Sequence, residues 1–163
     1  MNELKTWENL NEAFRTYRED IYTFIYYKAN KSKDFAEDIT QDTFEKAWIK
    51  RDLYKGGNLK NWLFQIAINI AKDQFRKNNK FLELNEINET FVESSETETY
   101  KYYIIVALKQ LTEKEKELII LFYILDYSHK EIAEILNSRE GAIRVAVHRS
   151  FLKLKKIANE NIT

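Results

Sequence analysis

Apolar residues recur at helical spacing through the first half of the chain, which predicts three helices there. The first apolar stripe runs from Leu10 to Asn30 and the second from about Asp34 to Asp52. A third follows from Lys60 or Asn61 to about Lys77, after a loop that contains two adjacent glycines.

The second half begins with a helical pattern over Lys101 to Leu111. Thr112 and Glu115 then have the spacing of a capping box, which marks the start of another helix. Its apolar face continues up to Asp126. We expect this pair of helices to be the scaffold for the segment that follows.

The segment from Tyr127 to Lys156 has the pattern of two helices joined by a tight turn. Ser128 and Glu131 form a second capping box, and Asn137 tolerates the left-handed backbone that a sharp turn requires. Ala133 is small where the two helices would cross. The pattern predicts a helix-turn-helix, and a plain helical hairpin with a solvated basic face is the alternative. The apolar positions that share one face of the second helix are Ile143, Val147, Phe151 and Leu154.

A helix-turn-helix places the N-terminal part of its second helix in the DNA major groove. Arginine reads guanine bidentately, glutamate accepts from cytosine, and other polar groups hold phosphates. The candidate contacts with duplex DNA are Lys130, Arg139, Glu140, Arg144, His148 and Arg149.

Composition favours an all-α fold, because the chain has no proline and only three glycines among 163 residues. It has no cysteine and two histidines far apart in sequence, so neither a metal site nor a cofactor is expected. No apolar run approaches the roughly 20 residues of a membrane helix, and the N-terminus is unlike a signal peptide. We therefore expect a cytoplasmic protein that does not insert into membranes.

The charges cancel overall but are unevenly distributed. Residues 43–80 contain nine basic and three acidic side chains, and residues 128–156 contain seven and three. Between them, residues 81–100 contain six glutamates and no basic residue. This pattern predicts two small helical domains, 1–80 and 101–163, joined by a flexible acidic linker over 81–100.

Two polar faces in the first half are candidate sites. Asp38, Gln41, Asp42 and Glu45 form a mostly acidic stripe, suited to a basic partner protein or simply to solvent. Asn69, Lys72, Asp73 and Arg76 form a face suited to base edges and phosphates, or again to solvent.

The order of these parts resembles the extracytoplasmic-function group of bacterial RNA polymerase sigma factors. AEDITQDTFEKAW (36–48) resembles the helix of that family that binds core polymerase, and NWLFQIAINIAKDQFRK (61–77) its −10 recognition segment. LKQLTEKEKELIILFYILDYSHKEIAEIL and SREGAIRVAVHR resemble its −35-reading domain. The resemblance implies a sigma-2-like bundle and a sigma-4-like helix-turn-helix domain.

The resemblance also implies partners and residue roles. The acidic stripe would face the β′ clamp helices of core polymerase, and the second domain would approach the β flap. The loop from Tyr54 to Asn61 would capture a flipped base of the opened strand. An anti-sigma factor is a further expected partner, because many members of the group are held by one. The expected −10 contacts are Tyr54, Asn58, Lys60, Asn61, Asn69, Lys72, Asp73 and Arg76.

The predicted function is therefore that of a sigma factor, which recognises −10 and −35 promoter elements and stabilises the opened −10 strand. The alternative is a helix-turn-helix regulator that binds duplex DNA without polymerase. An enzyme is not expected, because the sequence shows no nucleophile–base arrangement, phosphate-binding glycine loop or metal set.

Overall fold

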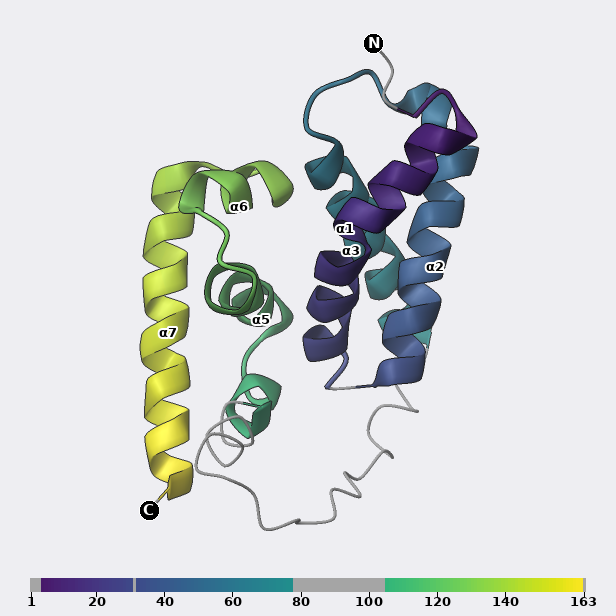
Figure 1. The fold of residues 1–163 in the computed structure, drawn as a ribbon. Helices are drawn as coiled ribbons and strands as arrows, with labels where there is room; N and C mark the ends of the chain where they lie inside the picture. Colours follow the sequence, from purple (N-terminus) through teal and green to yellow (C-terminus); the bar gives the residue numbers. More distant parts are fainter. Residues whose placement is uncertain (1–3, 31, 78–104, 163) are drawn as a thin grey trace.

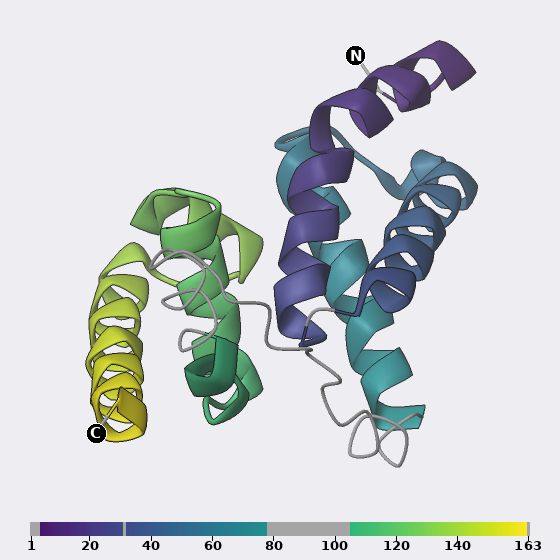
Figure 2. The same ribbon diagram turned by 60° about the horizontal axis from the view of Figure 1, so that its bottom comes forward.

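The computed structural model describes residues 4–30, 32–77 and 105–162. In these ranges the chain forms helices and connecting turns, without a β-strand. The expected linker over 81–100 lies outside the described residues. The helices form two groups that lie side by side in both ribbon views, α1 to α3 and α5 to α7 (Figures 1 and 2).

The N-terminal group contains three long helices, as the hydrophobic pattern predicts. They are α1 (Trp7–Lys28), α2 (Lys33–Ile49) and α3 (Leu59–Lys77). Thr6 and Ser32 cap the first two by accepting hydrogen bonds from backbone N–H groups. The expected helix to Asp52 ends at Ile49 instead, and a 3₁₀ turn, η1 (Arg51–Leu53), follows it.

Aromatic and aliphatic side chains fill the centre of this group. Phe24 and Phe64 are fully buried and meet edge to face, with their ring centroids 5.6 Å apart. Ile21 and Ile25 of the expected α1 stripe are also fully buried, whereas Phe14 is 37% exposed. The outer end of the stripe therefore remains at the surface.

The C-terminal group combines several short elements with one long helix. Residues 105–109 are helical, and α5 (Glu113–Ile119) continues as a π-helical turn, η2 (Ile120–Ile124). Next come α6 (His129–Ile135) and the long α7 (Glu140–Ile162). Both expected capping boxes are present, Thr112 with Glu115 and Ser128 with Glu131.

The predicted helix-turn-helix consists of α6 and α7, which cross at a steep angle in Figure 1. Asn137 adopts a left-handed φ of 50°, as its position in the turn predicts. The Ser138 N–H donates to the Ala133 carbonyl at 2.8 Å, which closes the turn. Ile143 and Val147 are buried beneath α6.

None of the helices in the described part of the chain has the length and apolar character that crossing a membrane requires.

Candidate nucleic-acid and polymerase interface

The outer face of α7 carries the candidate duplex contacts. Arg139, Glu140, Arg144, His148 and Arg149 are all exposed, and so is Lys130 on α6. The buried residues Ile143, Val147 and Leu154 hold the opposite face of α7 against the protein. The fold therefore leaves each of the predicted side chains accessible.

Arg144 already has a partner on this surface. Its Nη2 lies 3.0 Å from Glu140 Oε1, one helical turn earlier. Both side chains are largely exposed, so this ion pair contributes only a few tenths of a kcal/mol. Duplex DNA could therefore displace Glu140 from Arg144 at little energetic cost.

The candidate −10 residues fall into two sets along α3. Asn69, Lys72, Asp73 and Arg76 are exposed on its later turns. Asp73 and Arg76 pair with each other at 2.8 Å. Lys60 and Asn61 at the start of α3 instead point to the C-terminal group, where each contacts a glutamate of α6.

Tyr54 is only 3% exposed, and its hydroxyl donates to the Gly57 carbonyl at 2.7 Å. Its ring packs on Trp62, with centroids 5.2 Å apart. Gly56 and Gly57 both have φ near +95°, a conformation that favours glycine. In this structure Tyr54 therefore fixes the shape of the loop, while Asn58 remains exposed and also accepts from the Asn61 N–H.

The acidic stripe of α2 is exposed at Asp38, Gln41, Asp42 and Glu45. Gln41 Nε2 donates to Glu45 Oε1 at 3.0 Å. Beneath the stripe, Thr40 and Thr43 are buried and donate to backbone carbonyls of α2. The helix thus keeps one side in the protein and turns its carboxylates outward.

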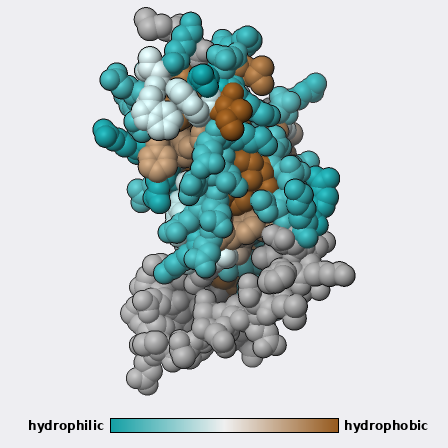
Figure 3. Space-filling model, turned by 90° about the vertical axis from the view of Figure 1, so that its right-hand side faces the viewer, coloured by the Kyte–Doolittle hydropathy of each residue, from teal (hydrophilic) through white to brown (hydrophobic). Residues whose placement is uncertain are grey.

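An apolar groove lies beside this stripe, and sequence reasoning missed it. It has a volume of about 410 Å³ between α1 and α2. Trp7 and Trp48 meet edge to face on it at 5.0 Å, and Ile49 is 75% exposed. Figure 3 shows this side of the molecule, where pale and brown side chains emerge among hydrophilic ones. The lining residues are Trp7, Leu10, Asn11, Phe14, Gln41, Phe44, Glu45, Trp48 and Ile49.

The groove could have been suspected from the number of aromatic residues in the first two helical stripes. Trp7 lies before the expected start of the first helix, so its spacing with Trp48 was not visible. An exposed apolar surface next to charges is typical of a protein-binding site.

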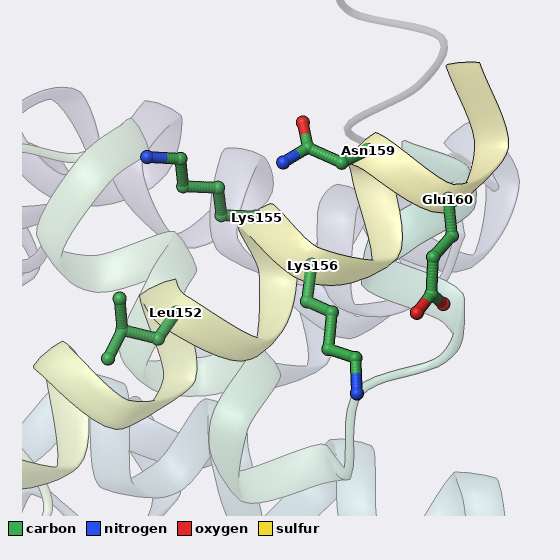
Figure 4. Close-up of a pocket in the computed structure, with 5 residues that line it drawn as sticks. All are labelled: Leu152, Lys155, Lys156, Asn159 and Glu160. Carbon is green, nitrogen blue, oxygen red and sulfur yellow. The ribbon is translucent and has the colours of Figure 1, made fainter. Parts of the chain in front are cut away.

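A shallow depression on the last turns of α7 is the least specific of these surfaces. Figure 4 shows Lys155 and Asn159 on one side of the helix, and Leu152, Lys156 and Glu160 on the other. These side chains converge on no common point.

The combination of an exposed helix-turn-helix with a second polar helix and an acidic stripe beside an apolar groove is typical of a DNA-binding protein that also engages a protein partner. The family model for sigma-70 region 2 matches residues 13–81, and that for sigma-70 region 4 matches residues 101–154. The chain belongs to the sigma-70 family of RNA polymerase sigma factors, in the extracytoplasmic-function group.

Curated relatives cover nearly the whole chain. The ECF RNA polymerase sigma factor SigM of Bacillus subtilis is 28% identical over 159 residues, which cover 94% of this chain and 97% of SigM. SigW of the same organism is also 28% identical, over 86% of this chain and 83% of the SigW chain.

Two solved structures resemble the whole fold. The sigma factor RpoE of Bartonella quintana, in complex with the anti-sigma factor NepR, has a TM-score of 0.71 and 26% identity; 93% of this chain and 98% of RpoE are covered. CnrH, in complex with the cytosolic domain of CnrY, has a TM-score of 0.75 and 18% identity, over 98% of this chain and 93% of CnrH. At that identity the likeness shows the fold alone.

The chain is therefore a sigma factor that directs polymerase to promoters. The alternative of a regulator that acts without polymerase is not favoured, because both halves match sigma-factor regions.

Proposed function

We propose that this sigma factor divides its work among three surfaces. The α2 stripe and the adjoining groove dock on core polymerase, α3 and the loop before it hold the opened −10 strand, and the outer face of α7 binds the −35 duplex. The observation that carries this proposal is the pairing of an exposed basic recognition helix with an acidic, apolar-edged surface that would repel DNA.

The docking surface combines two complementary interactions. The carboxylates of Asp38, Asp42 and Glu45 attract basic side chains, and the groove takes an apolar side chain from the same partner. The β′ clamp helices of polymerase are the partner proposed for this surface, and the β flap for the C-terminal group.

At the −10 strand, the residues of α3 would act on different parts of the DNA. Lys60, Lys72 and Arg76 would hold phosphates, whereas the amides of Asn58, Asn61 and Asn69 suit base edges. Asp73 would orient Arg76, to which it is already paired. Tyr54 would support the loop from inside.

The limits of the two domains are proposed at 1–80 and 101–163, with the linker over 81–100. The family matches at 13–81 and 101–154 support this division. We propose that the protein works in the cytoplasm, where polymerase and promoter DNA are. An anti-sigma factor is a further proposed partner, since the similar RpoE is in complex with one.

Run-off transcription tests the function. Core bacterial polymerase, this chain and upstream regions that include its own gene's should give specific transcripts only when both proteins are present. Tight binding of the free chain to duplex DNA, with no transcript, would support the regulator alternative instead.

A further inference from the structure

Helix α6 packs on the start of α3, and its glutamates accept hydrogen bonds from two candidate −10 residues. Lys60 Nζ lies 3.0 Å from Glu131 Oε1, and Asn61 Nδ2 donates to Glu134 Oε2 at 3.0 Å. Lys60 keeps only 17% of its side chain exposed, and Asn61 is 8% exposed. A carboxylate oxygen is the same kind of acceptor as a phosphate oxygen. The two glutamates therefore occupy positions that a DNA strand would need.

A buried ion pair joins the two helical groups at another point. Lys28 at the end of α1 has 1% of its side chain exposed, and its Nζ lies 2.5 Å from Glu117 Oε1 and 3.2 Å from Glu113 Oε2. Both glutamates belong to α5. A buried ammonium without a partner is strongly unfavourable. Separation of the groups must therefore bring Lys28 into water.

Tyr127 forms a third connection, between the C-terminal group and both α1 and α3. Its hydroxyl donates to the Asp20 carboxylate on α1, and its ring meets Phe64 edge to face at 5.8 Å. The Lys60 ammonium lies 4.1 Å from the centre of the same ring. Tyr127 is 8% exposed. Polar, cationic and apolar contacts thus meet on one side chain.

Two further −10 candidates lie beside the contact between the two groups. Asn69 and Lys72 line a cleft of about 600 Å³, whose other wall includes Glu113, Glu117 and Asn137. Asn69 and Lys72 are nevertheless exposed, as are the candidate −35 residues on α7. The packing of the two groups therefore engages Lys60 and Asn61 of the −10 site and leaves the candidate −35 residues exposed.

Promoter geometry requires a more extended form. The −10 and −35 elements are about 25 base pairs apart, or roughly 85 Å at 3.4 Å per base pair. A compact chain of this length has a radius of gyration of about 15 Å, so it is roughly 40 Å across. The two helical groups cannot reach both elements while they are packed together.

We propose that the free protein is autoinhibited by this closed arrangement. Glu131 and Glu134 of α6 compete with the −10 strand for Lys60 and Asn61, and the Lys28–Glu117 pair and Tyr127 hold the groups together. Single-stranded DNA or polymerase must displace them. The inference rests on the proposed function, because it assigns Lys60 and Asn61 to the strand.

The test compares a double glutamate variant of the full chain with a single-substitution control. The double variant Glu117→Gln/Glu131→Gln removes the carboxylate that pairs with Lys28 and the one that pairs with Lys60, while glutamine at 131 still completes the α6 capping box. The control is Glu115→Gln, because Glu115 is the equivalent capping-box residue of α5 and its lysine partner, Lys153, lies within its own group at 2.8 Å.

Opening is measured by energy transfer between two dyes. The chain has no cysteine, so Glu37→Cys on α2 and Lys156→Cys on α7 give unique labelling sites, and both residues are exposed. Affinity for random-sequence single-stranded DNA is measured on the same samples, and far-UV circular dichroism checks that the helices are retained.

We expect the double variant to lose transfer efficiency and to bind single-stranded DNA about tenfold more tightly, as when an open form of roughly 10% becomes dominant. The Glu115→Gln control should match the parent in both measurements. If the double variant loses its helices, Tyr127→Phe replaces it, because this substitution removes only a hydroxyl. Tyr127→Phe should then show a smaller loss of transfer efficiency and a smaller gain in single-strand affinity.

Unchanged transfer efficiency, or opening without a gain in single-strand affinity, would overturn the autoinhibition. Promoter-specific run-off transcripts together with either result would leave the proposed function standing. Absence of transcripts would count against the function itself, whichever form the free chain adopts.

Discussion

Arg144 illustrates how weakly the candidate DNA-contacting side chains are held by the protein. Its partner Glu140 is 3.0 Å away, on an exposed helix face where water competes for both groups. The Glu140 contact therefore orients the Arg144 side chain along α7 but holds it only weakly.

Arg144→Ala should cost about 1–3 kcal/mol of binding at one −35 position if the arginine reads a base. The measurement is the affinity of the polymerase holoenzyme for a set of single-base −35 variants. Lys155→Ala, further along α7, is the control. A loss of equal size on every variant would make Arg144 a phosphate contact instead.

Asn137 holds the turn of the helix-turn-helix with a φ of 50°. A β-carbon in this region costs roughly 1–2 kcal/mol, which asparagine partly recovers through its short polar side chain. Asn137→Ala should therefore lower the free energy of unfolding by about 1 kcal/mol, measured by urea titration.

Asn137→Gly is the matched control, because it deletes the same side chain and relieves the strain. It should be as stable as the parent or slightly more so. Equal destabilisation by alanine and glycine would show that the asparagine side chain, and not the backbone conformation, matters at this position.

At the scale of elements, the features that can be predicted from the sequence are those that depend on residues close together in the chain. The capping boxes at Thr112 and Ser128, the left-handed Asn137 and the apolar faces of α3 and α7 all depend on residues within one or two turns, and the structure confirms them. The roles proposed for individual residues at the −10 and −35 sites stay predictions.

Features that depend on distant residues could not be predicted in this way. Lys28 looks like an ordinary lysine in the last turn of a helix, and only its packing on α5 explains why it is buried. The α1–α2 groove needs Trp7 and Trp48 to meet across 41 positions of sequence. The π-helical turn at η2 replaces an expected α-helix without a local signal.

The docking surface of α2 can be tested by its two components separately. Asp42→Lys reverses a charge of the stripe, and Ile49→Ala removes an apolar side chain that is 75% exposed and so contributes little to the fold. Each should weaken binding to core polymerase at least several-fold while the thermal unfolding midpoint changes little.

Glu160→Lys and Leu152→Ala on α7 are the matched controls (Figure 4), because they make the same kinds of change on an exposed helix away from the stripe. Polymerase affinity that is unchanged in Asp42→Lys would refute the docking role of the stripe.

At the scale of the whole molecule, acid should open the closed form. Burial favours a higher pKa for Glu113, but the charges of Lys28 and Lys116 outweigh it and hold the pKa below 4.5. The hydrogen bond from the Ser128 backbone, with Lys60, likewise lowers the pKa of Glu131. Glu117, Glu134 and Asp20 are the other carboxylates at the contact.

Only the part of each lowering that comes from Lys28 or Lys60 depends on the contact between the groups, and through that part Glu113 and Glu131 bind fewer protons in the closed form than in the open one. Their contribution is therefore complete at neutral pH and is lost as the pH falls below 4.5. Dye transfer should stay constant from neutral pH down to the ordinary carboxylate range and then fall. Opening that begins near neutral pH, with the helices intact, would contradict this assignment.

The burial of Lys28 also has a chemical consequence. Acylating reagents attack an uncharged amine that solvent can reach, and an ammonium locked between two carboxylates offers neither condition. Brief treatment of the free chain should leave Lys28 unmodified while Lys156 at the surface reacts, and peptide mass spectrometry can compare the two. Once the protein is part of a transcribing complex, Lys28 should react as well. A native amine would then report, without any engineered label, how long this factor stays open between rounds of initiation.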